Sequence, residues 1–359
     1  MKTKLVALAT TIIASALFAV SSGKAASIPG WKVLNFDVDQ SVSSQKQTSV
    51  LLDDKKDLHS AENSIRLWTG ARGLKILRGA ISDMRGKYPE DKWLSFEGSG
   101  DLHQVAATLI ETLPKPYQPI TVIQIDNHPD WFNAPEHFHC GAWVVQALKH
   151  PWVEKVIMVG QNSSDIRGDQ FRFAPFNELR SGRVEMHPLL KEQALVPFLW
   201  SSHVKGVAAS HKRIWGTELK FDTVRSVGAE AMGDRLAREL AGKNIYISLD
   251  KDVMGEADAL TDWDQGQMTL KELLTIIGKI TASANLVGMD ICGERAPQPL
   301  HGLLKRIDSG RLTKPGAKDF DHANQVNEKT NLDIIKFIER ECAVSKNVSG
   351  EVNARPAKK

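Results

Sequence analysis

The chain has 359 residues, of which 42% are apolar and 25% are charged, and its formal net charge is +3. This composition is typical of a globular protein and excludes a disordered, collagen-like or coiled-coil chain. Outside residues 5–20, no apolar run approaches the ~20 residues that a membrane-spanning helix needs.

Residues 1–25 have the pattern of a secretory signal. Lys2 and Lys4 precede the apolar run, and Gly23 and Ala25 provide the small side chains that cleavage after Ala25 requires. A buried or anchoring N-terminal helix is the alternative. Removal of these residues takes away three lysines and no acid, so the mature chain carries no formal net charge. We therefore expect a periplasmic or secreted protein with no membrane attachment after cleavage and without the basic surface of a nucleic-acid-binding protein.

Short apolar runs rich in β-branched residues alternate with helical patterns along the rest of the chain. Such continuous hydrophobic strands suit a sheet buried on both faces, and their alternation with helices predicts a mainly parallel sheet in an α/β fold. Thr269 is the expected N-cap of a helix over 270–281, with Glu272 completing a capping box. The predicted strands are 31–36, 93–96, 120–125, 155–159, 244–249 and 286–291. The predicted helices are 104–113, 142–149, 191–199, 232–240, 270–281 and 332–342.

We expect one domain over 26–344, because no internal repeat or long linker interrupts this region. The segment 345–359 is polar with scattered charges and is predicted to be a flexible tail. Cys140, Cys292 and Cys342 are too few for a disulfide scaffold, and the sequence does not decide whether two of them pair.

One group of acidic and histidine residues directly follows a predicted buried strand. Asp126, His128 and Asp130 come after 120–125, and alternate residues of an extended chain face the same way. Two carboxylates and an imidazole that face one another are unfavourable unless a cation compensates them. A polar loop with one histidine is the simpler alternative for this segment taken alone.

Two further segments favour a metal site. Asp250 and Asp252 follow the strand 244–249, and His103 follows the strand 93–96 through a glycine-containing turn. Because open α/β sheets place their ligand sites at the carboxyl ends of the strands, these residues can share one site. Carboxylates and imidazoles together suit Mn²⁺ better than a closed zinc site, and four carboxylates predict two ions. The expected ligands are His103, Asp126, His128, Asp130, Asp250 and Asp252.

This set of motifs resembles that of the ureohydrolases, the family of arginase and agmatinase. Their metal motifs run Gly-Gly-Asp-His, Asp-x-His-x-Asp and Asp-x-Asp, and the six ligand types occur here in that order. The segment 263–270 also looks like the family segment that follows the last metal motif. The resemblance covers roughly residues 93–294 and implies the arginase-like fold, a three-layer α/β/α domain around a mainly parallel sheet.

The resemblance also implies a chemistry, the hydrolysis of a guanidino or amidino C–N bond with two Mn²⁺ ions per chain. A hydroxide that bridges the ions attacks the guanidinium carbon and urea leaves, while Asp130 orients the hydroxide. One ion would take His103, Asp126, Asp130 and Asp250. The other would take His128, Asp126, Asp250 and Asp252.

The sequence departs from the family pattern at several positions. In the first motif, Leu102 separates Asp101 from His103. The proton-shuttling histidine, which family members place directly before a glycine, corresponds here to His139 or to His137, and a pair of surface histidines is the alternative.

The substrate-facing positions also differ. Glu294 is the best candidate to pair with a guanidinium, yet it stands one position late in the family's Asp-x-x-Glu pattern. The usual Asp-Pro after Asp-x-Asp is replaced by residues 253–257. Asn162 and Asp165 lie where family members hold substrate amino or carboxylate groups, with a solvated turn as the alternative.

Aromatic residues flank the predicted metal site. Trp131 and Trp263 can stack on a planar cation, although tryptophans are more often packing anchors. Cys140 and Cys292 also stand beside the motifs and need no function as small buried side chains.

We expect a urea-releasing manganese enzyme acting on a small guanidino or amidino compound, with Asp130, His139 and Glu294 as its catalytic residues. One alternative is a single-zinc deacetylase or amidohydrolase of the same overall fold, which needs neither His103 nor Asp252. The other is a non-catalytic protein that binds metal or guanidinium. Family members are often trimers or hexamers, so a homo-oligomer is also expected.

Overall fold

Eight parallel strands form the central sheet of the computed structural model, which describes residues 28–132, 138–197, 199–311 and 317–353. The strands in the middle of the sheet are continuous runs of buried residues, as expected for a sheet covered on both faces. In spatial order the strands are β2 (Asp54–Asp57), β1 (Trp31–Asp37), β4 (Lys92–Phe96), β13 (Asn285–Cys292), β12 (Asn244–Asp250), β5 (Ile120–Ile125), β7 (Val153–Val159) and β8 (Val184–His187).

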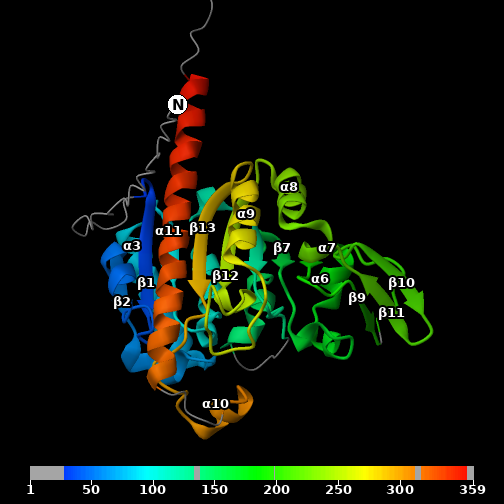
Figure 1. Cartoon of the computed structure of the whole chain (residues 1–359), viewed down its shortest axis with the longest axis horizontal. Helices are drawn as coiled ribbons and strands as arrows, with labels where there is room; N and C mark the ends of the chain where they lie inside the picture. Colours follow the sequence, from blue (N-terminus) through cyan, green and yellow to red (C-terminus); the bar gives the residue numbers. More distant parts are fainter. Residues whose placement is uncertain (1–27, 133–137, 198, 312–316, 354–359) are drawn as a thin grey trace, which may run out of the picture.

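Helices cover both faces of this sheet, and each face has its own hydrophobic cluster. The first face carries α3 (Ala71–Lys87), α4 (Val105–Glu111) and α5 (Trp143–Ala147). The opposite face carries α8 (Ala229–Leu240), α9 (Leu270–Thr281) and α11 (Ala317–Asn353), and Figure 1 shows these three helices against the sheet. The predicted three-layer α/β/α architecture is therefore confirmed.

Smaller elements extend this framework. The short helices are α1 (Lys46–Leu51), α2 (Glu62–Ile65), α6 (Phe176–Ser181), α7 (Val224–Val227) and α10 (Leu303–Asp308). An antiparallel sheet holds β10 (Ala209–Arg213), β11 (Gly216–Lys220) and β9 (Gln193–Val196), and a two-stranded sheet pairs β3 (Trp68–Thr69) with β6 (Phe138–His139).

All six predicted strands are present, but one predicted helix is wrong. The segment 191–199 contains the strand β9 instead, in which Ala194 and Val196 are buried and Gln193 and Leu195 are exposed. This alternation has the period of a strand, and pairing with β11 supplies the hydrogen bonds. At the other end of the chain, α11 begins fifteen residues before the predicted 332–342 and continues to Asn353, into the expected tail.

The predicted capping box of α9 is confirmed. The Thr269 hydroxyl accepts a hydrogen bond from the Glu272 backbone N–H, and the Glu272 carboxylate accepts one from the Thr269 backbone N–H. The predicted signal, residues 1–25, lies outside the described residues. Within the described part of the chain, no helix is long and apolar enough to cross a membrane.

Candidate metal centre

The predicted ligands lie where three strands of the central sheet end. Asp126 directly follows β5, Asp250 is the last residue of β12, and His103 follows β4 after the 3-10 turn Gly100–Leu102. The register pairs Leu249 of β12 with Ile125 of β5, so the acids that follow these residues emerge side by side. Parallel strands thus bring together residues that are more than a hundred positions apart.

The first group of candidate ligands contains His103, Asp126 and Asp130. The Nδ1 atom of His103 lies 2.8 Å from Asp130 Oδ2 and 3.3 Å from Asp126 Oδ2. One ligand atom from each residue lies within 4.8 Å of the others. Asp130 has a φ of 45°, and its Oδ2 accepts a hydrogen bond of 2.9 Å from Trp143 Nε1. The chain therefore turns sharply at Asp130, and Trp143 fixes its carboxylate.

The second group contains Asp126, His128 and Asp252. His128 Nδ1 lies 2.8 Å from Asp252 Oδ2 and 3.8 Å from Asp126 Oδ1. These three residues also offer ligand atoms within 4.8 Å of one another. Asp126 belongs to both groups and turns one oxygen toward each histidine. Asp126 could therefore offer an oxygen to a cation held by either group.

The sixth predicted ligand, Asp250, lies beside the first group. Its Oδ2 is 3.7 Å from His103 Nδ1 and accepts a hydrogen bond of 3.2 Å from Cys292 Sγ. Gly100 leaves room for this oxygen of Asp250, since the Cβ of any other residue at position 100 would lie only 2.9 Å from it. All six predicted ligands thus meet at one edge of the sheet.

A hydrogen-bonded chain below the site fixes the tautomer of His103. The Ser248 hydroxyl donates to Asp290 Oδ1 over 2.8 Å and lies 2.9 Å from His103 Nε2. Because a hydroxyl has one proton to donate, His103 must donate its Nε2–H to Ser248. In the neutral ring the lone pair then sits on Nδ1, the buried atom that faces the carboxylates of Asp130 and Asp126. An imidazole oriented in this way is typical of a metal ligand.

The electrostatics also fit a bound cation. Burial and the negative charge of Asp126 raise the pKa of Asp130 to about 7. Burial lowers the pKa of His103, but the carboxylates of Asp126 and Asp130 outweigh burial and hold that pKa well above its usual value. Without a metal, protons must offset these crowded acids. A divalent cation can take over that role, so the residues present fit the implied metals.

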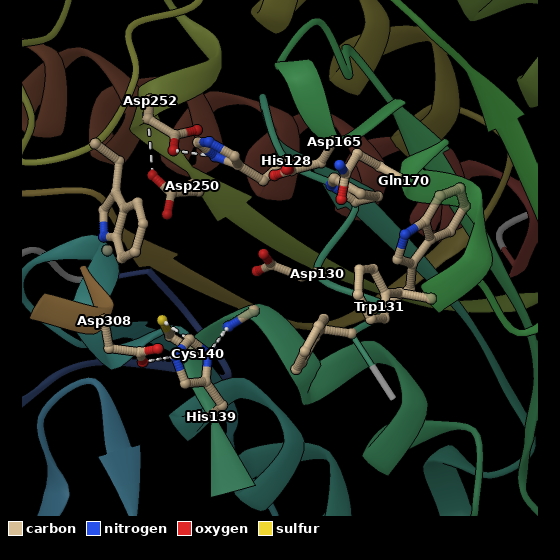
Figure 2. Close-up of a pocket in the computed structure, with 16 residues that line it drawn as sticks. His128, Asp130, Trp131, His139, Cys140, Asp165, Gln170, Asp250, Asp252 and Asp308 are labelled. Carbon is tan, nitrogen blue, oxygen red and sulfur yellow. Dashed lines mark hydrogen bonds and ion pairs between the residues drawn. The ribbon is translucent and has the colours of Figure 1, made fainter. Parts of the chain in front are cut away.

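A pocket of about 340 Å³ opens onto four of the predicted ligands, His128, Asp130, Asp250 and Asp252. Figure 2 shows Asp130 at its centre, between Asp250 and Asp252 on one side and Asp165 and Gln170 on the other. No lysine or arginine is among the described residues that line it. The pocket therefore offers carboxylates, amide and imidazole groups to whatever enters.

Aromatic side chains form the apolar wall of this pocket. Trp131 is buried and packs edge-on against Phe171, with ring centroids 5.1 Å apart. Phe132 and Phe173 lie together at 4.6 Å and also line the pocket. Trp263 stacks with a cation of the chain itself, because the Arg311 guanidinium lies 4.9 Å from its ring.

Two of the predicted catalytic residues line the pocket. Besides Asp130, these include His139, whose Nδ1 accepts a 2.9 Å hydrogen bond from the Gly141 backbone N–H. The other ring nitrogen lies 3.3 Å from Asp308 Oδ2 and therefore carries the proton. A proton-transfer role for His139 stays a prediction. The alternative, His137, lies outside the described residues.

The structure does not place the third one, Glu294, in the pocket. Its carboxylate is buried and pairs with Lys251 Nζ at 2.5 Å, and it accepts hydrogen bonds from Gln45 and Asn331. Lys251 stands between two candidate ligands in sequence, and its ammonium group donates to Glu294 and Asn331. The ammonium group of Lys251 thus holds the carboxylate that was expected to pair with a guanidinium, and that role of Glu294 stays a prediction.

Of the two residues expected to hold substrate amino or carboxylate groups, one lines the pocket. Asp165 lines the pocket, whereas Asn162 does not and donates its backbone N–H to Asn127. Cys140 and Cys292 are buried free thiols. The sequence analysis missed Ser248, which alternates with Asp250 along β12 and could have been found from that spacing.

No protein-family model matches the chain. An uncharacterized protein from Thermotoga maritima is 22% identical over 225 residues, which cover 63% of this chain and 67% of that protein.

Solved structures of ureohydrolases superpose on most of the chain. Formimidoylglutamase from Bacillus subtilis has a TM-score of 0.53 at 13% identity and covers 89% of both chains. A hypothetical agmatinase from Burkholderia thailandensis has a TM-score of 0.51 at 14% identity, again over 89% of both chains. Proclavaminate amidino hydrolase from Streptomyces clavuligerus has a TM-score of 0.51 at 12% identity, over 86% of this chain and 92% of that one. The chain therefore has the fold of the ureohydrolases, the family that its motifs resemble.

Proposed function

We propose that this protein is a hydrolase of the ureohydrolase type, which uses two divalent cations to cleave a C–N bond of a small guanidino or amidino compound. The observation that carries the proposal is the sharing of Asp126 between two candidate ligand groups, each with its own histidine. We assign His103, Asp130, Asp126 and Asp250 to one ion, and His128, Asp252, Asp126 and Asp250 to the other. Mn²⁺ suits these carboxylate and imidazole ligands.

When bound, such a pair of ions supplies Lewis acidity and lowers the pKa of water in the site. The chain's own residues do the rest. Asp130 faces the pocket with one oxygen fixed by Trp143, so its carboxylate can orient a nucleophilic water. His139 also lines the pocket, and its Nε2 can exchange a proton with the leaving group when that group replaces Asp308, which lies 3.3 Å away in this structure, as its partner.

The pocket favours a substrate that is cationic and planar. Asp165 and Asp308 add negative charge away from the candidate ligands, and the aromatic wall can pack on an amidine plane. The proposal also includes export through residues 1–25, by their resemblance to a secretory signal.

The test is to assay the purified protein for bound metal and for product release together. The expected result is two Mn²⁺ per chain, with release of urea, ammonia or formamide from at least one of arginine, agmatine, guanidinobutyrate and formiminoglutamate. Full metal loading with no hydrolysis of any of them contradicts the catalytic proposal. Guanidinium binding without turnover under those conditions supports the non-catalytic alternative, which the engagement of Glu294 by Lys251 favours.

A single-zinc hydrolase is the second candidate, because Asp126 and His128 form a three-residue group with Asp252 and without His103. This group differs from the single-zinc site expected from the sequence, which needs neither His103 nor Asp252. The variant His103→Ala separates the two. Loss of one of two bound ions supports the two-metal enzyme, and unchanged loading with a single zinc supports the alternative.

A further inference from the structure

A third group of candidate ligands includes a thiol. His103, Asp250 and Cys292 each offer one ligand atom, and these atoms lie within 4.8 Å of one another. Asp250 and Cys292 are the last residues of β12 and β13 and are paired in register, so their side chains leave the sheet on the same face. The Sγ–Oδ2 distance between them is 3.2 Å, and both residues are buried.

A buried acid beside this group has no hydrogen-bond partner. Glu97 is fully buried, and neither of its carboxylate oxygens makes a hydrogen bond within the described residues. Its backbone N–H donates to the carbonyl oxygen of Ile291, the neighbour of Cys292. A buried polar group left unsatisfied is costly. Glu97 thus places a carboxyl group without a hydrogen-bond partner among the described residues at the end of β4, beside the end of β13 that carries Cys292.

The distances suit one shared ion. Zinc binds sulfur at about 2.3 Å and nitrogen or oxygen at about 2.0–2.2 Å, so two ligands of one ion lie roughly 3–4 Å apart. The observed separations of 3.2 Å and 3.7 Å from Asp250 Oδ2 to Cys292 Sγ and His103 Nδ1 fall in this range.

We propose that Cys292 is a ligand of the metal ion on the His103 side, which gives that position a mixed nitrogen, oxygen and sulfur coordination. This inference rests on the proposed metal centre. On binding, the thiol releases its proton to solvent and the thiolate sulfur donates an electron pair to the ion. The His128 side keeps only nitrogen and oxygen ligands.

Such a ligand changes which metal the protein prefers. Thiolates favour zinc and other softer ions, whereas carboxylates and imidazoles alone accept Mn²⁺. The two positions should therefore differ, with a softer ion such as Zn²⁺, Fe²⁺ or Co²⁺ beside Cys292 and Mn²⁺ tolerated beside His128.

The other buried thiol, Cys140, provides a matched control. Cys140 lines the pocket, but its sulfur lies 3.6 Å from His139 Nδ1 and belongs to no group of candidate ligands. Substitution of Cys140 should leave the coordination of both ions unchanged.

The experiment loads the full protein with Co²⁺ and records its absorption spectrum and cobalt content. We expect two Co²⁺ per chain and a thiolate-to-cobalt charge-transfer band in the near ultraviolet. The band should vanish in C292S, with the visible cobalt bands retained, and persist in C140S. In competition, C292S should shift the preference from Zn²⁺ toward Mn²⁺ by about 10-fold or more.

Two results overturn the inference alone: bound Co²⁺ without the charge-transfer band in the wild-type protein, or a band that persists in C292S. In either case the thiol only donates a hydrogen bond to Asp250. Failure to bind Co²⁺ at all contradicts the proposed metal centre as well. Zinc-edge X-ray absorption of the wild-type protein needs no variant, and a sulfur neighbour at about 2.3 Å supports the inference while a shell of nitrogen and oxygen alone contradicts it.

Discussion

Asp126 shows how much one side chain can organise. One of its oxygens faces His103 and the other faces His128, and Gln124 donates a 2.8 Å hydrogen bond to it. The backbone N–H of His128 donates to the same carboxylate over 2.7 Å. Asp126 is therefore fixed between two imidazoles before any ion binds.

Ser248 should act on metal binding through His103, which it orients without facing the pocket. We expect Ser248→Ala to weaken binding on the His103 side by about 10–100-fold, because the ring loses the partner that fixes its tautomer. Isothermal titration of the metal-free protein measures this. Ser95 is the control, since it shares the face and register row of Asp290 and its hydroxyl has no hydrogen-bond partner within the described residues. Equal losses in Ser95→Ala would show that any cavity at this row disturbs the site.

Glu294 should matter for stability and not for substrate binding. The variant Glu294→Gln leaves the buried ammonium group of Lys251 without its ion pair, which costs about 3–5 kcal/mol. Denaturant unfolding measures the loss, and steady-state kinetics should show a KM close to that of the wild-type protein. A KM raised 10-fold or more with unchanged unfolding would instead place Glu294 in the substrate site.

At the residue scale, the sequence predicted which acids and histidines lie together better than it predicted which residues line the pocket. Alternation along extended chain places Asp126, His128 and Asp130 together, and the strand ends bring in the rest. The engagement of Glu294 depends on where the Lys251 side chain turns, and no periodicity encodes that direction. The position of Lys251 between Asp250 and Asp252 is the one feature of the sequence that could have pointed to this pairing.

The strands of the central sheet bring the candidate ligands together, because all of these strands end at the same edge of the sheet. The central strands were predictable because continuous apolar runs bounded by turns have few other interpretations. The strand β9 was not predictable, because in so short a segment the alternation of apolar residues cannot be distinguished from a helical pattern. Hydrogen bonding to β11, which lies elsewhere in the sequence, makes this segment a strand.

The capping box makes α9 a test case at this scale. Thr269→Ala removes the hydroxyl that accepts from the Glu272 backbone N–H and should reduce the free energy of unfolding by about 0.5–2 kcal/mol. Thr275, inside the same helix, is the control, and its replacement by alanine should not destabilise. Urea unfolding of the two variants makes the comparison, and an equal effect would contradict the capping role.

For the whole molecule, the buried acids predict opposite pH dependences with and without metal. The pKa of Asp130 is raised to about 7, and that of Asp290 to about 6, chiefly by burial. A folded metal-free chain then binds more protons than the unfolded chain between about pH 4 and 7, so its stability falls as pH rises through this range. The raised pKa of His103 acts in the same direction, since its stabilisation is lost at pH values above 6.5.

Bound metal should reverse this trend. Because the ligands must lose their protons, metal affinity rises with pH, and a metal at 100 times its Kd adds about 2.7 kcal/mol. Thermal unfolding at pH 5 to 8 should show a falling Tm without metal and a steady or rising Tm with Mn²⁺. Asp130→Asn should flatten the slope of the metal-free protein. Parallel slopes with and without Mn²⁺ would contradict the assignment of these acids as ligands.

The most direct measurement is an anomalous difference map from crystals of the protein grown with Mn²⁺. The account predicts two peaks roughly 3.5–4 Å apart, with the Asp126 carboxylate between them, His103 on one and His128 on the other. A single peak, or peaks elsewhere on the surface, would contradict it.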